Sequence, residues 1–539
     1  MSSNDSTLNR RDFVKLVGGA GVAAAAALSG VEVDLHAQAP RTTAPGPDPA
    51  ERDLALLALD AAKSAGALYA DVRIIRMNTE SLATRERQIT NVSKSESYGI
   101  GIRAFVGGSW GFSATRDVTR DAVVRAAREA VGIASANDRI APSRVTLAPV
   151  EKVPDGRWIT PHRIDPFTVS LESKAELLFR INDEALKVKG VRFVNSSVTS
   201  YKESRLLATS EGSLIQQTFI RVSPDVSVTA IADDNSDSQT RSSADPPTAM
   251  GWEYVTGLTL PESAIRYANE AVAKLSAPRV EPGAWDLVLH PSHLWLTIHE
   301  SIAHSTELDR ALGYEANYAG TTFLAPPEQM LGKFRFGRDL MNVVANRTEP
   351  GGCATVGWDD EGIAATAYPI IDKGLFVSYQ SATRELVDIV SGISPLKRAP
   401  GHAYGQSWGS IPFGRMPNVS LQPASRDISE AEVIAATDRG IYIEGDGSYS
   451  IDQQRYNFQF GGQTFWEIRN GKKTRMLRDV AYVSRTPDFW NAMAMIGGRQ
   501  TYQLYGALND GKGQPTQSNS VSHGCPVALF RGVNVLRTG

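Results

Sequence analysis

Two histidines five residues apart constrain this chain more than any other feature of its sequence. They are His299 and His304, in the stretch HESIAHSTELD. Apolar residues at helical spacing predict a helix from His293 to Ala311. On an ideal helix, positions five apart are separated by roughly 140°. Both imidazoles can reach one metal ion only if the helix is widened, as a π-type turn does. We expect such a distortion between His299 and His304.

The side chains around these histidines are those of a hydrolytic metal site. Imidazole is the commonest protein ligand of a catalytic metal, and a neighbouring carboxylate can act as a general base on bound water. We therefore expect His299 and His304 to bind the metal and Glu300 to be the catalytic carboxylate. Glu307 and Asp309 would either bind the metal or accept a hydrogen bond from a ligating imidazole. The alternative is an amphipathic surface helix whose polar side chains are only solvated.

A third metal ligand has to come from another part of the chain. The candidates are Asp510 in the polar turn DGKGQ, and His523 and Cys525, which alternate on one face of a predicted strand. Cys353, which lies among glycines, is predicted to be structural. These are the two cysteines of the chain, so a disulfide between them is the alternative to a thiolate ligand. The residues alone leave both possibilities open.

Residues 1–37 are predicted to be an export signal. The adjacent Arg10 and Arg11 precede the apolar run 16–28 and small residues near Ala37, which is the order found in twin-arginine signals. We expect cleavage after Ala37 and a periplasmic or other extracytoplasmic location. The apolar run is shorter than the ~20 residues of a spanning helix, so no stable membrane span is expected after cleavage. Residues 38–50 are predicted to be an exposed linker.

The rest of the chain is predicted to be of the α+β class. Helices beside blocks of hairpin-connected strands predict an N-terminal α+β domain over residues 51–280. Aromatic strands and turn signals predict a β-rich C-terminal domain over residues 281–539, with the metal-site helix near its start. Two local expectations are Asp117 as the N-cap of a helix and a loop over residues 233–247. A net charge of −3 and the lack of a basic run argue against nucleic acid as a partner.

The stretch HESIAHSTELD resembles the H-E-x-x-x-H-x-x-E-x-D segment of the TldD/PmbA family of metalloproteases. Other segments resemble parts of that family in the same order along the chain, namely residues 98–115, 356–386, 445–460 and 467–480. The resemblance implies an N-terminal α+β domain and a C-terminal β-rich domain that holds one zinc ion per subunit. It also implies hydrolysis of small or unfolded peptides.

Carried onto this chain, the resemblance makes His299 and His304 the zinc ligands and Glu300 the catalytic carboxylate. The family's third ligand is a cysteine that opens a C-G-K segment. DGKGQ resembles that segment with Asp510 in the cysteine's place, and a carboxylate can also bind zinc. The resemblance further implies a homodimer, or a heterodimer with a PmbA-like subunit. The alternative function is that of a non-catalytic peptide-binding or assembly subunit with a structural metal.

Overall fold

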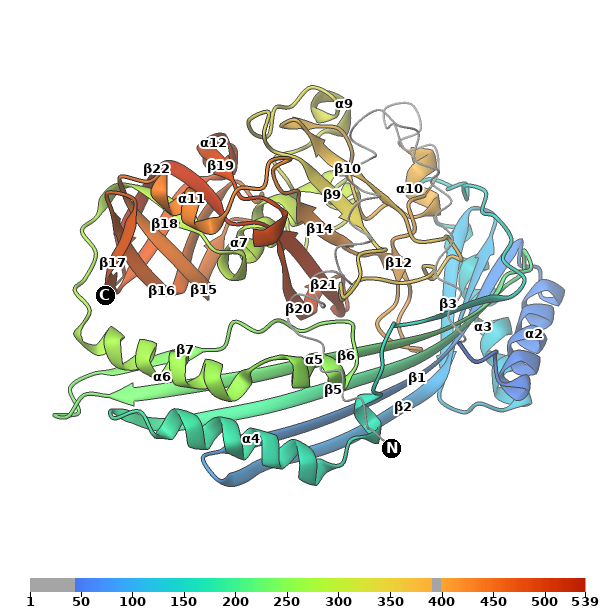
Figure 1. The fold of residues 1–539 in the computed structure, drawn as a ribbon. Coiled ribbons are helices and arrows are strands. Elements are labelled where there is room, and N and C mark those ends of the chain that lie inside the picture. The colour runs from blue at the N-terminus through green and yellow to red at the C-terminus, as the bar shows by residue number, and fades with distance from the viewer. Residues whose placement is uncertain (1–43, 390–398, 539) are drawn as a thin grey trace.

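The computed structural model describes residues 44–389 and 399–538 (Figure 1). The predicted signal peptide, and the predicted linker as far as residue 43, lie outside the described residues. The architecture is α+β, as predicted, and two seven-stranded sheets organise it. The first sheet has the order β3-β2-β1-β5-β6-β4, with β7 beside β6. Its strands are β1 (Tyr69–Arg85), β2 (Gln88–Val106), β3 (Ser109–Thr115), β4 (Gly156–Ile159), β5 (Val191–Thr209), β6 (Leu214–Ile231) and β7 (Ser238–Ser242).

Helices cover the long first sheet near its two ends (Figure 1). The two helices at one end, α2 (Pro49–Ser64) and α3 (Arg120–Asp138), pack on β1 and β2 through alanine-rich faces, because small side chains allow close approach. The three helices toward the other end pack on β5 and β6 through larger apolar side chains. These three helices are α4 (Leu171–Leu186), α5 (Trp252–Gly257) and α6 (Leu260–Ser276).

Two local predictions in this region are wrong. The N-cap of α3 is Thr119, not Asp117, because the Thr119 hydroxyl accepts the backbone N–H of Ala122. The predicted loop over residues 233–247 contains strand β7, which pairs with β6. The sequence of β7, SQTRS, has no apolar residue. Its strand conformation is therefore stabilised by backbone pairing with β6 and not by burial of apolar side chains.

The second sheet has the order β15-β8-β22-β18-β16-β17, with β19 beside β22. Parallel pairing of β8 with β15 and antiparallel pairing of β8 with β22 place β8 inside the sheet. The main core of the molecule lies around this sheet and includes the buried apolar residues of the metal-site helix. The strands are β8 (Gly283–Leu289), β15 (Arg439–Ile451), β16 (Asn457–Arg469), β17 (Lys472–Leu477), β18 (Val480–Arg485), β19 (Met493–Ile496) and β22 (Ala528–Arg537).

Smaller elements complete the β-rich part. A hairpin of β20 (Gln503–Lys512) and β21 (Gln517–Cys525) lies against the metal-site helix α7 (Pro291–Ile298). The other strands are β9 (Val343–Asn346), β10 (Ala367–Asp372), β11 (Leu375–Phe376), β12 (Ala403–Tyr404), β13 (Phe413–Gly414) and β14 (Asn418–Leu421). The short helices are α8 (Leu308–Ala311), α9 (Pro327–Met330), α10 (Arg384–Ile389), α11 (Glu430–Ala435) and α12 (Thr486–Asn491). Within the described residues, no helix has the length and apolar character needed to cross a membrane.

Candidate metal centre

The metal-site helix is widened at the two histidines, as their spacing predicted. Helix α7 continues into a π-helical turn over His299–Ala303 and then a 3-10 turn over His304–Thr306. The backbone N–H of His304 donates to the carbonyl of His299, which is the i→i+5 bond of a π turn. The two imidazole rings lie with their centroids 4.6 Å apart. The predicted distortion is confirmed, and the alternative of a solvated surface helix is wrong, because both rings are buried.

Gln380, on the loop between β11 and α10, holds the end of the widened turn. Its Nε2 donates to the carbonyl oxygen of Ala303 at 2.7 Å. Its backbone N–H donates to Thr306 and its carbonyl accepts the N–H of Leu308, both at 2.9 Å. These contacts satisfy backbone groups where the helix stops, which would otherwise be buried without partners.

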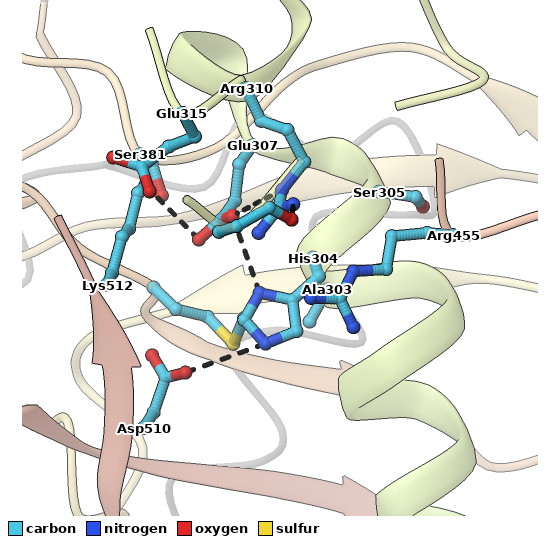
Figure 2. Close-up of polar contacts among 12 residues, drawn as sticks. Ala303, His304, Ser305, Glu307, Arg310, Glu315, Ser381, Arg455, Asp510 and Lys512 are labelled. Carbon is cyan, nitrogen blue, oxygen red and sulfur yellow. Dashed lines mark hydrogen bonds and ion pairs between the residues drawn. The ribbon is translucent and has the colours of Figure 1, made fainter. Parts of the chain in front are cut away.

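Asp510 faces His304 (Figure 2) and also lies near His299. It follows directly after an irregularity in the pairing of β20 with β21, and such bulges redirect a side chain. Its Oδ1 is 3.7 Å from His299 Nε2 and 3.5 Å from His304 Nε2. Its Oδ2 accepts a hydrogen bond from Arg415 Nη2 at 3.3 Å. The structure therefore brings Asp510, of the three candidate third ligands, to the ring nitrogens on the inner side of the site.

His523 lies behind His299 instead. The distance from His299 Nδ1 to His523 Nε2 is 2.8 Å, and His523 Nδ1 is 2.8 Å from the carbonyl oxygen of Val419. A carbonyl only accepts hydrogen bonds, so His523 Nδ1 carries a hydrogen and its Nε2 is the acceptor of a neutral ring. His299 therefore donates from Nδ1 and keeps the lone pair of Nε2 for the side that faces Asp510. The placement gives His523 a hydrogen-bonding role behind the expected ligand.

Glu307 lies behind His304 in a similar way (Figure 2). Its Oε2 is 3.4 Å from His304 Nδ1 and accepts Arg310 Nε at 3.0 Å, while its Oε1 accepts Lys512 Nζ at 3.3 Å. Burial alone would raise the pKa of Glu307, but Lys512 and Arg310 outweigh it and hold the pKa well below its usual range. The carboxylate is thus an ionised acceptor for the N–H of His304. Asp309 instead pairs with Lys512 Nζ at 2.7 Å.

Glu300 completes the cluster. His299, Glu300 and His304 each offer one nitrogen or oxygen atom that could bind a metal, and these three atoms lie within 4.8 Å of one another. The Glu300 carboxylate is buried and accepts a hydrogen bond from Arg455 Nη1 through Oε2. Burial raises the pKa of Glu300, while the positive charge of Arg455 acts in the opposite direction. Each carboxylate around the two histidines therefore has a cationic partner.

Both histidines are held in the neutral form that binds metals. Burial, aided by the positive charge of Arg455, lowers the pKa of His299 to about 3. The same two causes lower the pKa of His304 well below its ordinary value. At neutral pH both rings therefore present an unprotonated nitrogen, as ligation requires.

The two cysteines are free, buried thiols, so the disulfide alternative is wrong. Cys525 Sγ lies 3.7 Å from the carbonyl oxygen of Pro291, and the backbone N–H of Cys353 donates to the Ser522 hydroxyl at 2.9 Å. Burial raises the pKa of both thiols, well above the ordinary value for Cys525. Among the described residues, neither cysteine belongs to the group of His299, Glu300 and His304 whose ligand-type atoms lie close together.

Several residues of the site were not predicted from the sequence. Lys512 had one signal, its place beside Asp510 in the DGKGQ turn. The others are single polar residues in segments far along the chain, and nothing in their local sequence distinguishes them. They are Arg310, Gln380, Arg415 and Arg455.

Family models match most of the described chain. The model of the PmbA/TldA metallopeptidase C-terminal domain matches residues 282–537, and those of domain 1 and the central domain match residues 70–134 and 164–277. The chain belongs to the PmbA/TldD metallopeptidase family. The resemblance predicted from HESIAHSTELD is thereby confirmed for the family, whereas the predicted domain limits stay a prediction.

Curated relatives of this family carry metalloprotease names. A metalloprotease of Methanocaldococcus jannaschii is 24% identical over 416 residues, which is 76% of this chain and 86% of the relative. A metalloprotease TldD homolog of Buchnera aphidicola is 23% identical over 74% of this chain and 79% of the relative. A zinc metalloprotease TldD homolog of Saccharolobus solfataricus is 22% identical and covers 86% of this chain and 96% of the relative.

Solved structures of the family share the fold. A protein of Thermotoga maritima described as a modulator of a DNA gyrase superposes with a TM-score of 0.69 at 15% identity, over 90% of this chain and 100% of that one. TldE of Thermococcus kodakarensis superposes with a TM-score of 0.68 at 13% identity, over 90% and 99% of the two chains. At these identities the likeness describes the fold alone.

Proposed function

We propose that this chain is a zinc-dependent metallopeptidase whose metal is bound by His299, His304 and Asp510. The observation that carries the proposal is the convergence of both Nε2 atoms on one carboxylate oxygen, at 3.7 and 3.5 Å. A tetrahedral zinc site with bonds of ~2.0–2.2 Å places its ligand atoms roughly 3.3–3.6 Å apart. The residues present therefore fit a zinc ion. Two histidines and one carboxylate also form a known ligand set of catalytic zinc.

A zinc ion held there would polarise the peptide carbonyl and make water a stronger nucleophile at neutral pH. The protein's own acid–base group is Glu300, whose carboxylate takes the proton from the attacking water and delivers it to the leaving amine nitrogen. Burial supports this role, because it raises the pKa of Glu300 toward neutrality against the effect of Arg455. His523 and Glu307 fix the orientation of the two imidazoles.

A catalytic role is favoured over a structural metal by the partner of Glu300. A structural zinc site has four protein ligands, and a catalytic one keeps a position for water. The Glu300 carboxylate, which lies close to both histidines, accepts a hydrogen bond from Arg455, and the Glu307 carboxylate accepts hydrogen bonds from Arg310 and Lys512. Three protein ligands then remain, which is the number found at catalytic sites.

The remaining parts of the proposal concern substrate, partner and location. Peptides are the proposed substrates because the relatives carry metalloprotease names, and small or unfolded peptides are proposed because the family resemblance implies them. A homodimer, or a heterodimer with a PmbA-like subunit, is the proposed assembly. The twin arginines Arg10 and Arg11 support twin-arginine export to the periplasm. The proposals on substrate, assembly and location do not depend on the proposed chemistry of the site.

The chemistry is tested by pairing metal content with peptide hydrolysis. Glu300→Gln is expected to keep bound zinc but to lower kcat by roughly 10²–10⁴-fold, since it removes the proton acceptor. His304→Ala and Asp510→Ala are expected to lose zinc and activity together. Metal content is measured by mass spectrometry of the purified full chain, and hydrolysis with fluorogenic peptides and unfolded casein. Glu328→Gln, at an exposed glutamate, is the matched control.

Three outcomes would contradict parts of this proposal. Full peptidase activity of Glu300→Gln would remove the proposed base. Zinc binding that survives Asp510→Ala would show that the third ligand lies elsewhere. A zinc-loaded wild-type chain without hydrolytic activity would favour the assembly subunit.

A further inference from the structure

Arg455 reaches the site from the turn between β15 and β16. Its backbone has φ of +62°, in the left-handed region that costs a residue with a Cβ about 1 kcal/mol or more. The turn holds this conformation through hydrogen bonds at both ends of the residue. The Arg455 N–H donates to the carbonyl of Asp452 at 3.0 Å, and its carbonyl accepts the Thr486 hydroxyl at 2.7 Å.

This conformation directs the guanidinium toward His304 (Figure 2). Nη1 donates to Glu300, whereas Nε is buried without a hydrogen-bond partner among the described residues. The positive charge of Arg455 lowers the pKa of both His299 and His304, the two expected metal ligands. An unpartnered N–H of a buried cation is costly unless an acceptor arrives.

The geometry points to a further catalytic residue: Arg455 binds the oxygen of the scissile peptide carbonyl and stabilises the negative charge that develops on it. This inference rests on the proposed peptidase function. The acceptor that the free N–H lacks is then supplied by the substrate. A preorganised donor aimed at the developing charge acts mainly on the transition state.

Hydrolysis of the peptide bond then proceeds by addition of water followed by loss of the amine. The water oxygen forms a bond to the carbonyl carbon, the π electron pair moves onto the carbonyl oxygen beside Arg455, and the water proton goes to Glu300. The pair then returns to reform C=O while the C–N bond breaks. The proton moves from Glu300 to the amine nitrogen, and no oxidant or reductant is needed.

Another anionic acceptor is the C-terminal carboxylate of a short peptide. Arginine binds carboxylates in a fork geometry, so this alternative uses the same N–H groups. The position beside Glu300 and His304 favours the reacting carbonyl, because the water that Glu300 activates adds there. Peptides with a free or an amidated C-terminus distinguish the two acceptors.

The experiment compares Arg455→Gln, Arg455→Lys and Arg455→Gly with the zinc-loaded wild-type chain. Arg455→Gly guards against misfolding, because glycine adopts φ of +62° without strain. Arg455→Gln and Arg455→Gly are expected to lower kcat by roughly 10²–10³-fold with little change in KM, equally on free-acid and amidated peptides. Arg455→Lys should recover part of the loss. Zinc content should equal that of the wild type, as should the activity of Arg485→Gln, a control at an exposed arginine.

A second measurement does not depend on turnover. Affinity for a phosphonate peptide, whose charged oxygen imitates the transition state, is measured by calorimetry on each zinc-loaded variant. We expect the affinity to fall by about the same factor as kcat.

Unchanged kcat and phosphonate affinity in Arg455→Gln would overturn the inference. A rise in KM confined to free-acid peptides would overturn it in favour of the terminal carboxylate. A wild-type chain that hydrolyses no peptide would contradict the proposed function. The inference about Arg455 is tested apart from this by the phosphonate, and equal affinity of the wild type and Arg455→Gln for it would overturn that inference.

Discussion

At the scale of single residues, protonation at the site is decided by what faces each ring nitrogen. The chain of hydrogen bonds from the Val419 carbonyl through His523 to His299 leaves one tautomer of each ring. The ionised Glu307 does the same for His304. Such partners raise the basicity of a ligating histidine and hold its orientation.

This arrangement predicts the effect of removing His523. In His523→Ala the Nδ1–H of His299 loses its acceptor inside a buried site, so the ring is free to turn or change tautomer. We expect zinc affinity to fall by about 10–100-fold. Competition with a chelating dye measures the dissociation constant. His162→Ala, at a loop histidine, is the control, and equal zinc affinity of His523→Ala and wild type would show that His523 does not orient His299.

At the scale of elements, the widened turn was predictable from the sequence, but the side chain that hydrogen-bonds to its end was not. Histidines five residues apart require an i→i+5 turn if they are to converge, and this requirement is readable from the spacing alone. The carbonyls at the end of the turn then need donors, and any polar side chain of any loop satisfies that need. That this donor is Gln380 follows from the packing of its loop against the turn.

Gln380→Leu is predicted to destabilise the turn. It keeps a side chain of similar size but leaves the buried carbonyl of Ala303 without a donor, which costs about 1–3 kcal/mol. Urea unfolding of the variant and the wild type measures the difference. The exposed Gln329→Leu serves as the matched control and should change stability by less than about 0.5 kcal/mol. A Gln380→Leu variant as stable as that control would mean that another group satisfies the carbonyl.

At the scale of the whole molecule, the segment Asp359–Glu361, between β9 and β10 of the β-rich part, contacts the first sheet. Asp360 pairs with Arg205 on β5 and with Arg73 on β1, the latter at 3.5 Å. Glu361 lies 3.4 Å from Arg103 on β2 and accepts the backbone N–H of Arg384 at 2.9 Å. Moving Asp360 away from Arg205 and Arg73 would leave buried charges without a partner, so these ion pairs favour one placement of this segment on the first sheet.

Glu361 predicts how stability depends on pH. Burial raises its pKa to about 8, aided by Asp359 and opposed by Arg103. The folded pKa exceeds the unfolded value of ~4.3. The folded state therefore binds the proton more tightly, and this stabilising contribution is complete below about pH 4 and lost as pH rises through 8. We expect the free energy of unfolding to fall between pH 5 and 9.

Glu361→Gln should flatten that dependence, because an amide does not titrate. Urea unfolding at several pH values from 5 to 9 measures the slope for the wild type, for Glu361→Gln and for Glu151→Gln, an exposed control. Equal slopes for Glu361→Gln and the wild type would assign the dependence to other groups.

The sequence by itself determined the α+β class, the family and the need for a distorted helix at His299 and His304. These follow from periodicity, from motif order and from the angular geometry of a helix, all of which are local. It also singled out Asp510, although Cys525 and His523 remained open beside it.

Only the tertiary structure places these candidates relative to the two histidines, because residues distant in sequence meet only after folding. A bulge in β20 turned Asp510 toward both imidazoles, while His523 came to lie behind one of them. The left-handed turn that aims Arg455 at Glu300 has the same origin. A side chain's role at such a site depends on direction and burial, and neither is encoded in the spacing of residues along the chain.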